Sequence, residues 1–140
     1  MPSKDLTSMR LPMRWKSTFK HIAARCSQDP RVIALAPRLS VAKFVRFALG
    51  TGLSIALFGD LRGLWPGSMR TAEDGPFDWP VTFSMAGLRD DLSEVRRKLN
   101  SLSIHTVETT ALRTLIVLGV NHGLKDMGRP PSVNQSRGSD

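Results

Sequence analysis

The longest uncharged stretch of the chain lies between Arg46 and Asp60 and marks the helix around which we expect the fold to form. Its thirteen residues include six large apolar side chains, and other groups must cover them. Ser40 is a suitable N-cap for this helix, and Gly59 suits a stop in the left-handed conformation. Asp60 can cap a further short turn. The pattern predicts a central apolar helical region within residues 29–65.

This helix can be interpreted as a membrane span or as a helix buried in protein or at an interface. Spanning about 30 Å of hydrocarbon needs about 20 apolar residues, whereas the uncharged run covers only about 20 Å. The helix reaches the length needed to span a bilayer if it starts at Val41 and the side chains of Lys43 and Arg46 extend to the lipid head groups. Glycines within it would allow other helices to approach closely. The candidate membrane- or partner-binding residues here are Lys43, Arg46, Phe47, Gly50, Leu53, Leu57 and Trp65.

Residues 1–28 have the composition of a mitochondrial transit segment, because six Lys or Arg and six Ser or Thr accompany a single acid. Trp15, Phe19, Ile22 and Cys26 are spaced by four, three and four residues, which places them on one face of a helix. The cations of this helix lie off that face. We therefore expect a basic amphipathic helix that acts in targeting, lies on a membrane surface or packs on a partner.

Residues 66–83 combine three prolines, two glycines and three aromatic residues. Pro66 and Gly67 are expected to end the preceding helix. Since connections of this length are uncommon in a compact domain, we expect a long irregular strap that packs against something through its aromatic rings. Strand patterns are weak throughout the chain. The candidate partner-binding residues of the strap are Phe77 and Trp79.

Residues 84–123 carry the clearest helical pattern, a heptad seam of apolar positions that starts just after Ser84, which we expect to be its N-cap. The seam is under three heptads long and needs a partner helix. The nearest candidate is the apolar stretch 106–120, so a C-terminal helical hairpin is predicted. Residues 124–140 have the composition of a polar, disordered tail. The candidate partner-binding residues of the seam are Leu92, Val95 and Leu99.

The net charge of +8 belongs to the N-terminal half, since residues 1–70 carry +9 and residues 71–140 carry −1. A lipid, phosphate-rich or acidic protein surface is therefore expected near that half. Cys26 is the single cysteine, and the three histidines have no metal-ligand spacing. Asp90 and Asp91 are adjacent and diverge by about 100° on a helix, so they cannot act as a carboxylate pair. We expect no catalytic residues, no metal and no cofactor.

These features predict a mainly α protein that acts as a non-catalytic accessory subunit of a larger membrane assembly, most consistent with a mitochondrial inner-membrane complex. Its expected partners are other subunits of that complex and membrane lipid, with nucleic acid as a further possibility for the basic half. The expected segments are a basic segment (1–28), the apolar region (29–65), the strap (66–83), the hairpin (84–123) and the tail (124–140).

An alternative interpretation is a viral protein that binds nucleic acid or host membrane. A basic N-terminal part, an apolar helix containing KFVRFAL and a charged helix together resemble the layout of flavivirus capsid proteins over about a third of the chain. The resemblance implies binding to RNA and membrane. The chain departs from that family in its nearly neutral C-terminal half, which lacks the dense Lys/Arg helix laid on RNA. A ribosome-associated protein would use the same N-terminal cations.

Overall fold

The computed structural model describes residues 5–30, 40–73 and 75–124, which form a mainly helical fold with one small antiparallel sheet. The predicted helical class is therefore confirmed. Residues 125–140, nearly all of the predicted tail, lie outside the described part of the chain. The elements in order are β1 (Leu6–Leu11), α1 (Trp15–Cys26), α3 (Val41–Phe58), α4 (Leu61–Ala72), β2 (Trp79–Ser84), α5 (Arg89–Ser101), α6 (Glu108–Gly119) and the π-helical turn η1 (Val120–Leu124).

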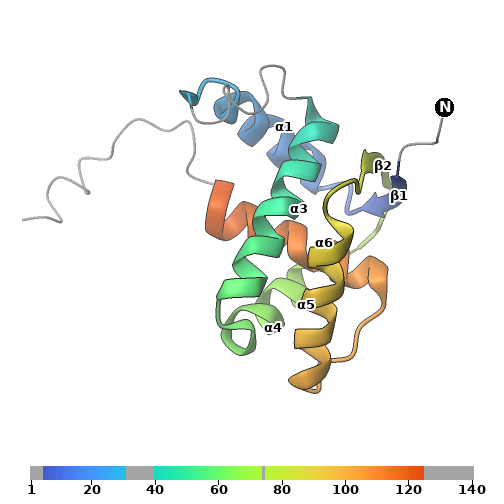
Figure 1. Cartoon of the computed structure of the whole chain (residues 1–140). Helices are drawn as coiled ribbons and strands as arrows, with labels where there is room; N and C mark the ends of the chain where they lie inside the picture. The colour runs from blue at the N-terminus through green and yellow to red at the C-terminus, as the bar shows by residue number, and fades with distance from the viewer. Residues whose placement is uncertain (1–4, 31–39, 74, 125–140) are drawn as a thin grey trace, which may run out of the picture.

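Helix α3 lies in the middle of the molecule, with α1, β2, α5, α6 and η1 packed around it (Figure 1). Its closest neighbour is α6, which crosses it at two glycines. A Cβ on Gly52 would overlap the carbonyl oxygen of Leu115, and a Cβ on Gly119 would overlap that of Ala48. The two backbones are therefore in direct contact. The close helix approach expected from the glycines occurs inside the chain's own core.

Both ends of α3 follow from local sequence. The Ser40 side chain accepts a hydrogen bond from the Lys43 backbone N–H at 3.2 Å and caps the first turn. Gly59 ends the helix as expected, but in an extended conformation with φ −102° rather than a left-handed one. Glycine is still required there, because a Cβ would lie 2.6 Å from the Ile55 carbonyl oxygen.

Lys98 of α5 satisfies the open carbonyls at the C-terminal end of α3. Its ammonium donates to three backbone oxygens that have no partner within the helix. These oxygens belong to Ala56, Leu57 and Gly59, at 2.9, 3.1 and 3.0 Å. The helix end is thus capped by a cation from a segment about 40 residues later, and a positive charge is favourable at this end of the helix dipole.

The prediction of an irregular strap at residues 66–83 is wrong at both of its ends. Helix α4 continues through Pro66 to Ala72, and residues 79–84 form strand β2. β2 pairs antiparallel with β1, from Leu6 opposite Ser84 to Leu11 opposite Trp79. Each strand has a single neighbour in this two-stranded sheet, and Pro80 is tolerated because an edge strand can leave one ladder donor out.

The C-terminal helices do not form the predicted hairpin. Helix α5 begins at Arg89, and Ser84 instead accepts a hydrogen bond from the Ala86 backbone N–H at 3.1 Å. The apolar seam of α5 is buried against α3, while α5 and α6 hardly touch each other. Helix α6 packs on α3 and α4. The seam did need a partner helix, but that partner is α3, because α3 offers apolar surface on several sides.

The amphipathic stripe predicted in the N-terminal segment is present in α1 and is buried in the core. Trp15 stacks on Phe19 with ring centroids 5.5 Å apart. Phe19 meets Phe44 and Trp79 edge to face, at 5.4 and 5.7 Å. Helix α1 is therefore part of the folded domain in this structure, and only its polar side is left for partners.

Candidate interaction surface

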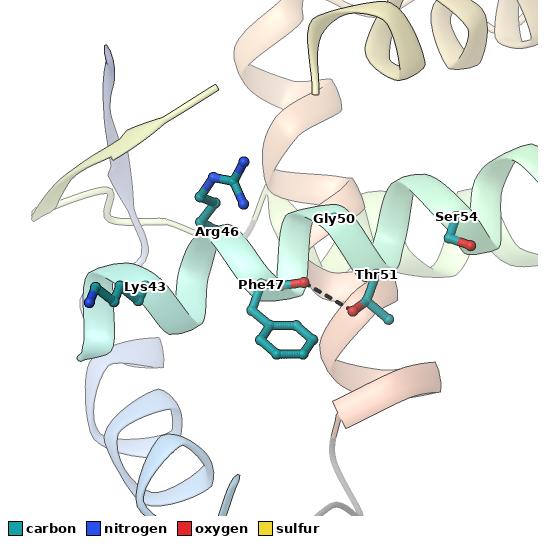
Figure 2. A pocket seen from close by; sticks show the side chains of 6 residues that line it. All are labelled: Lys43, Arg46, Phe47, Gly50, Thr51 and Ser54. Atoms are coloured by element: carbon teal, nitrogen blue, oxygen red, sulfur yellow. Dashed lines mark hydrogen bonds between the residues drawn. The ribbon is translucent and has the colours of Figure 1, made fainter. Parts of the chain in front are cut away.

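One side of α3 is only partly covered by the other described elements and carries a shallow hollow of about 660 Å³. The described residues that line it come from successive turns of this one helix, at intervals of three and four positions. One turn further along the same side, Phe58 is 87% exposed. We call this side the outer face of α3 (Figure 2). It consists of Lys43, Arg46, Phe47, Gly50, Thr51 and Ser54, which line the hollow, and Phe58.

The outer face is apolar and has few hydrogen-bonding groups to offer. The Thr51 hydroxyl donates to the Phe47 carbonyl oxygen at 3.0 Å, as the dashed line in Figure 2 shows. Its donor is therefore used within the helix, and its methyl group packs on Gly123 of η1, where an added Cβ would overlap it. Gly50 has no side chain, so the helix backbone itself forms the bottom of the hollow. The space above it is open, since the nearest atom to an added Cβ would be Leu88 Cδ2 at 3.9 Å. Such a surface suits packing with another apolar surface.

Arg46 lies at the edge of the hollow and is used by the fold. Its Nε donates to the Ser84 carbonyl oxygen at 2.9 Å and its Nη2 to that of Ala86 at 2.5 Å. Figure 2 shows its side chain leaving α3 on a different side from Phe47. The cation expected to reach lipid head groups instead fixes the connection between β2 and α5. Lys43 is exposed and has no partner among the residues described.

The other predicted site residues do not lie on the outer face. Leu57 is half-buried, and Phe77 is half-buried beneath the Arg113 guanidinium, 4.0 Å from the ring centroid. The remaining ones belong to the hydrophobic core, where they hold the fold together. These buried residues are Leu53, Trp65, Trp79, Leu92, Val95 and Leu99.

Three residues of the outer face were not among the sequence candidates: Thr51, Ser54 and Phe58. The available signal was helical spacing from Lys43, because positions 43, 47, 50, 51, 54 and 58 all fall on one side at 100° per residue. Two of the three residues are polar. Polar residues at helical spacing within an apolar run indicate the side of the helix that faces solvent.

Several cations that contribute to the basic charge have partners inside the fold. Arg89 donates to both carboxylate oxygens of Asp5, at 3.0 and 2.9 Å, and this bidentate contact lowers the pKa of the carboxyl. Arg113 donates to the Arg10 carbonyl oxygen at 2.9 Å, and burial lowers the pKa of its guanidinium. Side chains with no partner among the described residues are Arg10, Lys16, Lys20, Lys43, Arg62 and Arg70.

A second cationic surface lies on α1. Lys16 and Lys20 are one turn apart, and together with Met13 and Ser17 they surround a shallow hollow of about 440 Å³. Met13 is 43% exposed. The surface is the polar side of the predicted amphipathic helix.

Within residues 5–30, 40–73 and 75–124, no three His, Cys, Asp or Glu side chains gather as a metal site would require. Helix α3 has the length and composition to cross a membrane, and 39% of it is buried inside the chain's own fold. The core helix of a soluble protein meets the same criterion. Comparison with models of protein families, with curated proteins and with solved structures finds no match for this chain.

Proposed function

We propose that this chain is a non-catalytic accessory subunit of a larger membrane-associated assembly and that it joins the assembly through the outer face of α3. The observation that carries the proposal is the 87% exposure of Phe58 at one end of a hollowed face whose charged side chains, Lys43 and Arg46, lie at the other end. Covering a Phe side chain is worth about 1.5–3 kcal/mol. A partner that fills the hollow would gain this energy at little cost in desolvated polar groups.

The membrane part of the proposal rests on the same helix. The outer face has no charged side chain beyond Lys43 and Arg46 at its start, so it suits contact with apolar helices of a membrane complex. The mitochondrial inner membrane is the location that the composition of residues 1–28 predicts. In this proposal α3 stays in the core of the domain, and membrane attachment comes through partner subunits or through lipid contact at the surface.

Fractionation of cells that express the full chain tests the proposal. Membranes are washed with carbonate and with high salt, then solubilised in mild detergent and separated by size. We expect the chain to stay with the membranes and to migrate in a large complex. Ser54→Arg places a charge on the outer face and should release the chain as a small species. Ser93→Arg on α5, also an exposed serine in a helix, is the matched control and should behave like the unchanged protein.

Migration of the unchanged chain as a small free protein would overturn the proposal, and so would complexes that form equally well with Ser54→Arg. Release of the unchanged chain by salt alone would favour the second candidate function, nucleic-acid binding by a viral or ribosome-associated protein. The observation in its favour is the pair Lys16 and Lys20 on α1, which have no partner within the described residues. Its affinity for RNA should fall steeply with salt.

A further inference from the structure

We infer that the outer face of α3 binds the same face of a second copy of this chain, with the two α3 helices antiparallel and the twofold axis between Gly50 and Thr51. The inference rests on the proposed function in one respect, namely that the outer face is an interaction surface. It goes further by naming the partner and the geometry. Other partners of the assembly would then bind a dimer.

Six of the seven positions of the outer face are symmetric about that axis, and the seventh, Arg46, is bound to the connection between β2 and α5. Position 43 lies as far before the midpoint as position 58 lies after it. The same holds for positions 47 and 54 and for positions 50 and 51. A twofold interface requires this arrangement, because residue i of one copy must meet residue j of the other while j meets i. In an antiparallel pair, Lys43 therefore faces Phe58, Phe47 faces Ser54, and Gly50 faces Thr51.

The facing pairs nearest the axis allow close packing. The Phe47 ring of one copy meets Ser54 of the other, a large side chain against a small one. Gly50 has no side chain, and the Thr51 methyl group is turned to Gly123 of η1, so the two α3 backbones can approach closely at the axis. The fold itself gives no reason for glycine at position 50, since an added Cβ would have only one contact, at 3.9 Å. Glycine in a helix interior costs about 1 kcal/mol relative to alanine. A closely packed partner helix would account for it, as Gly52 and Gly119 do between α3 and α6.

The facing pairs are also complementary in charge. Lys43 would lie over the exposed ring of Phe58, which attracts a cation through the negative face of its π-system. Two residues further on is Asp60, whose Oδ1 accepts from the Arg62 backbone N–H at 3.2 Å and which has no cationic side chain as partner in the described chain. The Lys43 ammonium can reach this carboxylate. A parallel pair would instead bring Lys43 against Lys43.

The test uses single cysteine substitutions in the purified full chain, because the native Cys26 is buried. In the antiparallel dimer, the two copies of residue 50 lie beside the axis, offset along the helices by about one residue rise of 1.5 Å. The two copies of residue 58 lie about 22 Å apart, since fifteen residues separate 43 from 58 at 1.5 Å each. Gly50→Cys should therefore form a disulfide-linked dimer under mild oxidation. Phe58→Cys is the control, and it should link little although its position is far more exposed.

Light scattering of the unchanged chain should give twice the mass of one chain at about 100 µM. Gly50→Leu, which fills the hollow and leaves the monomer folded, should give the mass of one chain. A monomer at that concentration, or faster linking through Phe58→Cys than through Gly50→Cys, would overturn the inference. A monomeric purified chain found in a large cellular complex would overturn the dimer alone. A dimer found in no larger complex would overturn the proposed function alone.

Discussion

At the scale of single residues, two glycines decide how closely the central helices pack. Gly52→Ala would push a methyl group into the Leu115 carbonyl oxygen, and neither backbone can move without separating α3 from α6. We expect a loss of about 3 kcal/mol in the free energy of unfolding, measured with urea. The control is Gly50→Ala on the same helix, which should be neutral or stabilising by up to about 1 kcal/mol. Equal losses at both positions would contradict the contact between α3 and α6.

Lys98 is a second residue whose effect extends beyond its own helix. Lys98→Met keeps most of the aliphatic stem but removes the donor for three carbonyl oxygens at the end of α3. Leaving such groups unpaired costs about 1–3 kcal/mol, and we expect thermal unfolding to show a loss in that range. The neighbouring Arg97 makes only an exposed ion pair with Glu94, so Arg97→Met should change stability by less than about 0.5 kcal/mol. A larger effect at Arg97 would argue against the cap.

At the scale of elements, the sequence predicted what depends on neighbours along the chain and missed what depends on distant ones. Ser40 and Asp60 were identified as caps because a cap acts within its own first turn. Strand β1 was missed because its partner lies more than 60 residues away. β2 does alternate apolar and polar residues, but it lies in a stretch whose prolines and glycines indicated an irregular strap, and Pro80 fits a strand only at a sheet edge.

The candidate site was predicted in part for a similar reason. Lys43, Phe47 and Gly50 do lie on the outer face, whereas Leu53 lies in the core although it belongs to the same uncharged run. An apolar helix carries few polar residues to mark its solvent side, so hydrophobicity alone could not separate the two faces. The side that is covered depends on where α6 and α5 pack, and that information is not local.

The course of α4 through residues 66–72 can be tested with glycine. Gly67 lies within this helix and is exposed, with only the Arg70 guanidinium near an added Cβ, at 3.8 Å. Gly67→Ala should therefore stabilise the protein by about 0.5–1 kcal/mol. Gly87 is the contrasting case, since its φ of +80° strains any side chain although nothing lies within 4 Å. Gly87→Ala should cost about 1 kcal/mol. If residue 67 were in an irregular strap, the gain at Gly67 would be absent.

At the scale of the whole molecule, the contact between Asp5 and Arg89 ties the first strand to the start of α5. Arg89 lowers the pKa of Asp5 below its ordinary 3.8, so the charged carboxylate favours the folded state. This contribution is present above pH 4 and is lost as the pH falls through the lowered pKa. We expect Asp5→Asn to flatten the acid limb of a plot of urea midpoint against pH. Arg89→Met should flatten it equally, and the double variant should add nothing.

Whether α3 is a core helix or a membrane span is a property of the whole molecule, and two adjacent residues separate the alternatives. Leu53 is 1% exposed in the core, whereas Ser54 lies on the outer face. In a folded domain, Leu53→Arg should prevent folding, because it buries an unpaired charge. Ser54→Arg should change the free energy of unfolding by less than about 0.5 kcal/mol. In a bilayer both arginines would lie at similar depth and cost about 2.5–3.5 kcal/mol each. Circular dichroism and membrane integration of both variants therefore decide: unequal effects establish the core helix, and equal loss of integration establishes the span.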